Sequence, residues 1–135
     1  MWDAEACALA RAASDPDECG PFVATHRDFH ANNLMRAPEG TLAVLDFQDL
    51  RLGPPDYDAV SLRCERAGAA VDGAPAGVSE AVLLQRAWKV LGTFEKMLCL
   101  GRSSYVRHRD TALHVIRART RPGGRFAGLL SFLPR

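Results

Sequence analysis

Apolar residues recur at helical spacing over the second half of the chain. Between residues 80 and 98 they return every three or four positions, with charged side chains between them. This pattern predicts a long amphipathic helix over 80–98. A weaker repeat predicts a second helix over about 103–119, which Pro122 and the two glycines after it should end. We expect the short apolar stretch 126–133 to dock on these helices or to fray.

The first part of the chain alternates helix-forming and helix-breaking segments. Alanine, leucine and charged residues over 2–13 predict a helix, and the Ser-Asp-Pro-Asp at 14–17 predicts the break that ends it. A capped helix start is predicted over 56–62, after two consecutive prolines. Residues 66–79 are rich in glycine and alanine, and they predict a loose connection without chemistry.

Two short β-favouring runs lie between these helices. Phe-Val-Ala-Thr at 22–25 predicts one strand, and a second strand is predicted near 42–45. Glu39 and Gly40 form a tight-turn signal between the apolar residues around Met35 and the strand at 42–45. The pattern therefore predicts an α+β fold, mostly helical, with one short β-hairpin.

Composition limits the size and class of the protein. A chain of 135 residues, 47% apolar and 24% charged, allows one globular domain with a sizeable core. The net charge is +1, but residues 1–60 hold 11 acids against 4 bases (−7), while residues 101–135 hold 8 bases against 1 acid (+7). The acidic half suits a divalent cation. The basic end predicts a solvated helix face by default, with an interaction surface or part of a pocket for an acidic substrate as alternatives.

Targeting and redox features are weak. The four cysteines lie without Cys-x-x-Cys spacing, so they indicate neither a zinc site nor a disulfide framework. The N-terminus lacks the basic region and apolar run of a signal peptide, and no apolar stretch reaches the ~20 residues that cross a bilayer. We expect a soluble cytoplasmic protein, with neither a membrane nor a nucleic acid as its partner.

The chemistry is concentrated in the predicted hairpin and the loop before it. His26-Arg27-Asp28 is followed five positions later by Asn33, and Asp46 ends the second apolar run. In phosphoryl transfer one carboxylate accepts a hydroxyl proton, while an amide and a second carboxylate hold Mg²⁺ against nucleotide phosphates. The hairpin would carry Asn33 on one arm and Asp46 on the other, so both could face one site.

Two other interpretations of the same residues stay open. Taken singly, each aspartate or asparagine could be a turn or capping residue. Alternation along a strand would also place His26, Asp28 and His30 on one face, as in a zinc hydrolase. His108 and His114 supply no further ligand cluster, because they fall in a predicted helix six residues apart.

Motifs over residues 22–62 carry a family resemblance. They read His-Arg-Asp-Phe-His-x-x-Asn-Leu-Met, then Leu-Asp-Phe-Gln-Asp, then Gly-Pro-x-x-Tyr-Asp-x-Val-Ser-Leu. The chain thereby resembles the aminoglycoside phosphotransferase family, small-molecule kinases related in fold to protein kinases. Within it, the chain looks most like the anomeric kinases of N-acetylmuramate and N-acetylglucosamine. The resemblance implies a kinase-like C-terminal lobe, ATP and Mg²⁺ as cofactors, and an amino sugar or cell-wall sugar as the hydroxyl acceptor.

The resemblance also implies a role for each matching residue. Asp28 would orient the substrate hydroxyl and take its proton, while Asn33 and Asp46 would hold Mg²⁺ and the nucleotide. His26 would brace the loop. Asp58 would hold the backbone of the catalytic loop from behind, or be an ordinary helix N-cap.

The remaining expectations concern substrate contacts and completeness. His30 and Asp49 could reach the substrate, or be a packed histidine and a turn residue. No Gly-rich loop precedes the motifs, and the first lysine is Lys89. We therefore expect residues 1–135 to be a partial domain, the C-terminal lobe alone with its core at 22–62, weakly active or inactive unless an N-terminal lobe is supplied in trans. The alternative is a non-catalytic kinase-like binding module or a truncated pseudoenzyme.

Overall fold

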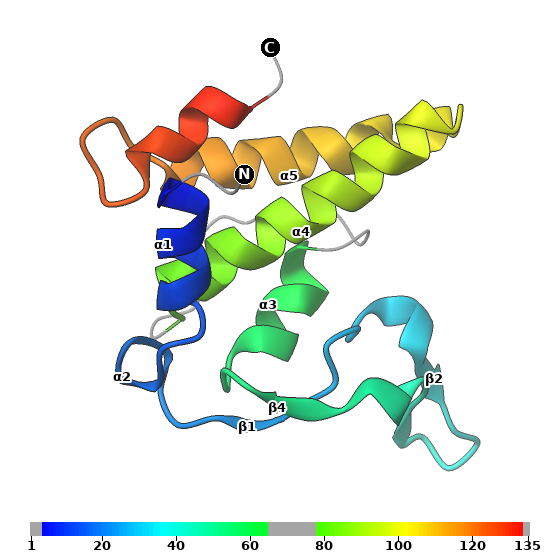
Figure 1. The fold of residues 1–135 in the computed structure, drawn as a ribbon. Coiled ribbons are helices and arrows are strands. Elements are labelled where there is room, and N and C mark those ends of the chain that lie inside the picture. The colour runs from blue at the N-terminus through cyan, green and yellow to red at the C-terminus, as the bar shows by residue number, and fades with distance from the viewer. Residues whose placement is uncertain (1–3, 65–77, 134–135) are drawn as a thin grey trace.

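The computed structural model describes residues 4–64 and 78–133, which are mostly helical (Figure 1). The α-helices are α1 (Ala4–Ala12), α2 (Pro16–Cys19), α3 (Tyr57–Cys64), α4 (Glu80–Cys99) and α5 (Val106–Arg119). The strands are β1 (Val23–Thr25), β2 (Leu34–Arg36), β3 (Leu42–Val44) and β4 (Arg51–Gly53). Short 3₁₀ turns lie at Ala31–Asn33, Phe47–Asp49, Ser103–Tyr105 and Ala127–Phe132. None of the described helices is both long and apolar enough to span a membrane.

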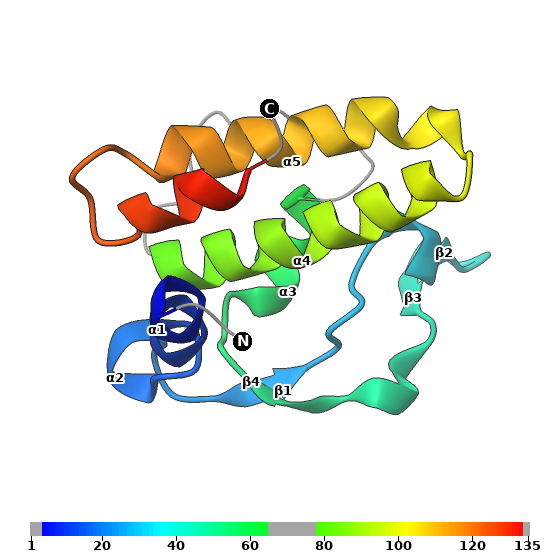
Figure 2. The same cartoon turned by 45° about the horizontal axis from the view of Figure 1, so that its top comes forward.

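The two long helices α4 and α5 pack side by side and supply most of the core (Figures 1 and 2). Both helices predicted from the periodicity are confirmed. Residues 81–84 of α4 are buried all round, because α1, α3 and α5 all pack on this helix. Gly101, with φ 78°, ends the turn after α4, and its N–H donates to the Leu98 carbonyl at 2.8 Å.

Both ends of the described chain pack on the helical core. The predicted first helix is confirmed as α1, and it buries Leu9 and Ala12. Near the other end, Phe126 and Leu129 are 4% and 3% exposed, and the 3₁₀ turn that holds Leu129 contacts α1. The apolar stretch 126–133 therefore docks.

The break predicted over 14–17 is wrong in one respect, because it contains the short helix α2. The Asp15 carboxylate caps this helix by accepting the N–H of Asp17 at 3.0 Å, and Pro16 occupies the first helical position. Residues that end α1 thus also start α2.

The strands form two separate antiparallel pairs. β2 and β3 make the predicted hairpin, with Leu34 opposite Val44, and Gly40 supplies a φ of 90° in its turn. β1 pairs with β4, which the sequence did not predict, with Val23 opposite Gly53. A Cβ at Gly53 would lie 2.9 Å from Thr25 Oγ1, so the close approach of these strands needs glycine there.

β4 leads through Pro54 and Pro55 into α3, which begins within the predicted range of 56–62. The start of α4 is tied to this turn, because the Ser79 N–H donates to Asp56 Oδ2 at 2.8 Å. The loose connection predicted over 66–79 lies, up to residue 77, outside the described residues.

Candidate active site

The loop at 26–33 and the turn at 46–49 meet at the ends of β2 and β3 that lie away from the hairpin turn. The Leu45 N–H donates to the Asn33 carbonyl at 2.8 Å, one step beyond the β2–β3 pairing. Asp46 follows Leu45 directly, so this bond holds Asp46 beside Asn33. The two residues predicted to bind metal are therefore brought together by the strand register.

The Asn33 side chain connects this pair to Asp28, earlier in the loop at 26–33. Its Nδ2 donates to the Asp28 main-chain carbonyl at 2.9 Å. The amide nitrogen is thus occupied, and Oδ1 is left to act as an acceptor or a metal ligand.

Asp46 has a left-handed backbone, with φ 64° and ψ 41°. Aspartate tolerates this conformation better than most residues. The Gln48 side-chain amide donates to Asp46 Oδ1. Oδ2 makes no hydrogen bond with any residue in the described ranges, so one carboxylate oxygen stays open.

Asn33 Oδ1 and Asp46 Oδ2 are hard oxygen donors, which suit Mg²⁺. No cluster of three or more His, Cys, Asp or Glu side chains with metal-site geometry occurs within residues 4–64 and 78–133. A site with two chain ligands still fits Mg²⁺, because this ion usually keeps several waters and binds substrate phosphates.

Asp28 projects from the same loop and is open to solvent. Its side chain is 54% exposed, and its Oδ2 lies 3.4 Å from Nε2 of His30, whose side chain is 17% exposed. The carboxylate is accessible to a hydroxyl, with an imidazole beside it. The structure places the His30 imidazole beside the Asp28 carboxylate, and contact of His30 with a substrate stays a prediction.

His26 joins the two loops from beneath. It is 5% exposed, and its Nε2 lies 2.7 Å from the Leu45 carbonyl. A carbonyl can only accept, so Nε2 is the donor in this hydrogen bond. Nδ1 is buried and has no hydrogen-bond partner among residues 4–64 and 78–133. The edge of the Phe29 ring also packs near the imidazole, at 5.8 Å between centroids.

Asp58 holds the backbone where the loop leaves β1. Its Oδ2 accepts the His26 N–H at 2.6 Å, and its Oδ1 accepts the Arg27 N–H at 2.9 Å. Arg27 has φ 70°, an uncommon conformation for a residue other than glycine, and the paired bonds help to fix it. Asp58 lies inside the first turn of α3, so the N-cap alternative is wrong.

Two further expectations have different outcomes. The zinc-hydrolase interpretation needs His26, Asp28 and His30 on one strand face, but β1 ends at Thr25 and the next residues form a loop. Asp49 lies exposed in the turn after Asp46, where it makes no hydrogen bond or ion pair with any described residue. Its contact with a substrate stays a prediction.

Sequence reasoning missed two contributors to the site. Gln48 positions the Asp46 carboxylate, and Leu45 supplies its peptide N–H and carbonyl to the opposite loop. Neither residue type signals a site. The Gln in Leu-Asp-Phe-Gln-Asp could have drawn attention only through its two-residue distance from Asp46.

Two comparisons with known proteins bear on this site. The model of the APH phosphotransferase enzyme family matches residues 1–97. The N-acetylmuramate/N-acetylglucosamine kinase of Neisseria meningitidis serogroup B (strain ATCC BAA-335 / MC58) is 55% identical over 42 residues. That stretch is 31% of this chain but only 12% of the Neisseria kinase, so the likeness covers a small part of the relative.

Proposed function

The chain belongs to the APH phosphotransferase enzyme family, and from this premise we propose that it carries the catalytic centre of an ATP- and Mg²⁺-dependent small-molecule kinase. We propose a hydroxyl of an amino sugar or cell-wall sugar as the acceptor, supported by the likeness to the Neisseria kinase. Membership of the family supports phosphoryl transfer in general. The identities of the nucleotide and of the acceptor are proposed in addition.

The observation that carries the proposal is the set of bonds around Asn33. Its side chain holds the Asp28 backbone, and its carbonyl accepts the N–H of the residue before Asp46. The backbones of the proposed general base and of both proposed metal ligands are thereby linked through one residue. Catalysis of phosphoryl transfer depends chiefly on such positioning and on charge stabilisation.

In the proposed reaction, Asp28 accepts the proton of the acceptor hydroxyl. The hydroxyl oxygen forms a bond to the γ-phosphorus while the bond from that phosphorus to the β–γ bridging oxygen breaks, and ADP leaves. The exposure of Asp28 allows the acceptor to approach, and His30 lies where it can orient the carboxylate. His26 and Asp58 keep the loop in place during transfer.

Asn33 Oδ1 and Asp46 Oδ2 would hold the metal ion. Bound there, Mg²⁺ would neutralise charge on the β- and γ-phosphates. We further propose that full turnover needs a nucleotide-covering lobe in addition to these 135 residues, either joined to this chain or supplied in trans. The only two lysines, Lys89 and Lys96, are exposed on α4.

The first test is Mg²⁺-dependent ATP turnover on a panel of amino sugars. The 135-residue chain, with and without an added N-terminal lobe, is compared with Asp28→Asn and with Asp17→Asn, a matched control on the exposed side of α2. Loss of the general base should lower the rate by about 10²–10⁴-fold, and the control should leave it unchanged. Equal rates for Asp28→Asn and the unaltered chain would exclude Asp28 as the base.

The metal ligands have a test that does not depend on turnover. Added Mn²⁺ should broaden the amide resonances of residues 33 and 46 first. Asp46→Asn should abolish that selective broadening, whereas Asp49→Asn should preserve it. Broadening that persists in Asp46→Asn would place the ion elsewhere.

A non-catalytic binding module remains the second candidate, and the exposed apolar side chains favour it. Nine of the twelve large apolar side chains that are exposed in the described structure lie between residues 22 and 52. They include Leu42 at 69%, Phe47 at 62% and Leu52 at 74%. Such a concentration is typical of a surface that another protein part covers. A folded chain without turnover even after the lobe is added would support this function.

A further inference from the structure

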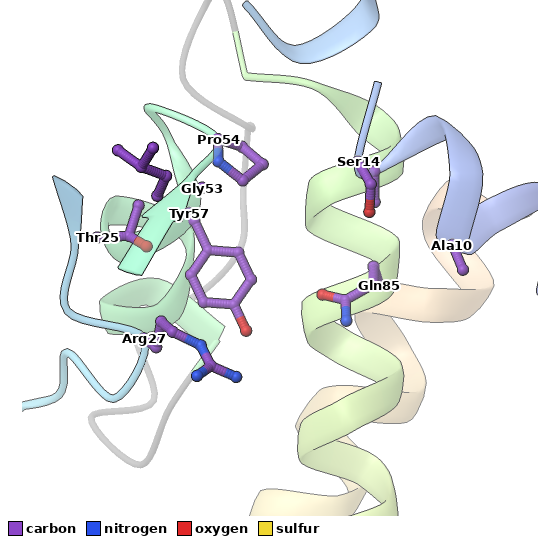
Figure 3. A pocket seen from close by; sticks show the side chains of 10 residues that line it. Ala10, Ser14, Thr25, Arg27, Gly53, Pro54, Tyr57 and Gln85 are labelled. Carbon is purple, nitrogen blue, oxygen red and sulfur yellow. The ribbon is translucent and has the colours of Figure 1, made fainter. Parts of the chain in front are cut away.

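A cavity of about 230 Å³ lies beside the loop at 26–33 (Figure 3). The end of α1, the β1–β4 pair, the start of α3 and helix α4 surround it. Arg27 lines it, but Asp28, Asn33 and Asp46 do not. The cavity is therefore distinct from the proposed site of phosphoryl transfer, although it shares one loop with it.

The charge in this cavity is not balanced. Arg27 is the one charged residue among the described residues that line it, and the lining contains no carboxylate. The Arg27 backbone N–H is taken by Asp58, whereas its guanidinium forms no hydrogen bond or ion pair with the parts of the chain that the structure describes. A half-buried guanidinium without a counter-charge favours an anion from solution.

Further hydrogen-bond donors lie around the same space. Figure 3 shows the Arg27 guanidinium and the Tyr57 hydroxyl on one side, and the Gln85 amide across from them on α4. Ser14, two residues after the end of α1, adds a hydroxyl. Thr25 also lines the cavity, but its hydroxyl already donates to the Arg51 carbonyl at 3.0 Å.

We infer that this cavity binds a small oxyanion, a phosphate or carboxylate group, through the Arg27 guanidinium with Tyr57 and Gln85 as further donors. Pockets for drug-sized ligands usually hold about 300–1,000 Å³, so this smaller space suits a group of a few heavy atoms. A planar guanidinium can bind such a group through two parallel hydrogen bonds.

An anion bound in the cavity would also restrain the loop at 26–33. Arg27 is the neighbour of Asp28, and Tyr57 is the neighbour of Asp58, whose carboxylate already joins the two segments. An anion held between Arg27 and Tyr57 adds a second connection across the same junction. Binding itself does not depend on phosphoryl transfer, so this inference and the proposed function can fail separately.

The test is a titration of the ¹⁵N-labelled 135-residue chain after metal ions have been removed on a chelating resin, which excludes metal-mediated binding and leaves no soluble chelator. Sodium phosphate and sodium acetate are added in separate arms, with chloride keeping the ionic strength constant. We expect saturating amide shifts at residues 26, 27, 57 and 58. Saturation with phosphate alone identifies a phosphate site, with acetate alone a carboxylate site, and with both a general oxyanion site.

Matched variants locate the anion. Arg27→Gln should weaken binding by about tenfold or more, because a charge-assisted hydrogen bond is lost. Arg51→Gln removes the same charge from the exposed face of β4, outside the cavity lining, and should bind as the unaltered chain does. Gln85→Met removes a donor from the α4 side without touching the loop, and should weaken binding several-fold even if Arg27→Gln fails to fold.

Three results would overturn the inference. The first is that neither anion saturates the amide shifts. The second is that Arg27→Gln binds as tightly as the unaltered chain or, should that variant not fold, that Gln85→Met does. The third is that Arg51→Gln loses as much affinity as Arg27→Gln. The last of these would indicate diffuse attraction by a basic surface instead of a defined site.

Discussion

Replacing Asp58 with asparagine would test how the loop that carries Asp28 is supported. The Asp58 carboxylate accepts two backbone N–H groups, from His26 at 2.6 Å and Arg27 at 2.9 Å. Asparagine keeps the shape of the side chain but has a single acceptor oxygen. Its NH₂ group would face one of the two backbone donors, and that donor would lose its partner.

The expected loss of stability is about 2 kcal/mol for Asp58→Asn, since hydrogen bonds to charged groups contribute about 1.5–3 kcal/mol each. Burial supports this value, because His26 is 5% exposed and water cannot easily replace the lost partner. Asp58→Ala removes both acceptors and should destabilise by about 3 kcal/mol. Either change is a large share of the ~5–15 kcal/mol that holds a typical domain folded.

Urea unfolding measures the global loss, and amide hydrogen exchange locates it. A local weakening of about 2 kcal/mol should speed exchange at residues 26 and 27 by about 30-fold. Asp17→Asn is the matched control at an exposed position of α2, and should change stability by no more than about 0.5 kcal/mol. Unaltered exchange at 26 and 27 in Asp58→Asn, with stability equal to that of the control, would refute the supporting role of this carboxylate.

Two further predictions concern strand packing and pH. Gly53→Ala should lower the free energy of unfolding by about 1–3 kcal/mol, because its Cβ would lie 2.9 Å from Thr25 Oγ1. Gly92→Ala in α4 has open space around its Cβ, so in thermal unfolding it should raise the stability by about 1 kcal/mol. Equal shifts for the two alanines would contradict the close approach of β1 and β4. The Arg125 guanidinium donates hydrogen bonds of 2.5 and 2.7 Å to the Glu18 carboxylate, and these bonds lower the pKa of Glu18. The ionised carboxylate should therefore stabilise the fold at neutral pH. That stabilisation should be lost as the pH falls through the lowered pKa. Melting temperatures of Glu18→Gln and the unaltered chain should therefore differ at pH 7 and converge in acid, and a gap that widens in acid would show the opposite linkage.

Patterns confined to neighbouring residues predicted most of the fold. α4 and α5 follow from apolar spacing, and the β2–β3 hairpin follows from a turn signal between two apolar runs. β4 was missed because three residues, Arg51–Gly53, form a strand only by pairing with β1, which lies more than 20 positions earlier. α2 was missed because the same Asp-Pro pair that ends one helix can start another.

The candidate site divides in the same way. The residue types of Asp28, Asn33 and Asp46 are visible in the sequence, and so is their placement around a hairpin. The contacts that hold their loop are not visible, because His26 bonds to Leu45 and Asp58, which lie 19 and 32 positions away, and Leu45 in turn bonds to Asn33 across the hairpin. The left-handed conformation of Arg27 depends on such contacts too, and it could not be read from the chain.

Leu45 takes part in the site without its side chain. Its N–H serves Asn33 and its carbonyl serves His26, while the leucine side chain is 41% exposed. Natural variation at position 45 is therefore compatible with an intact centre, provided that the replacement keeps a peptide N–H. Proline alone among the common residues would break the link to Asn33. The same position offers an attachment point for a spectroscopic probe directly beside Asp46, where metal or nucleotide binding could be observed without altering any of the residues proposed to do the chemistry.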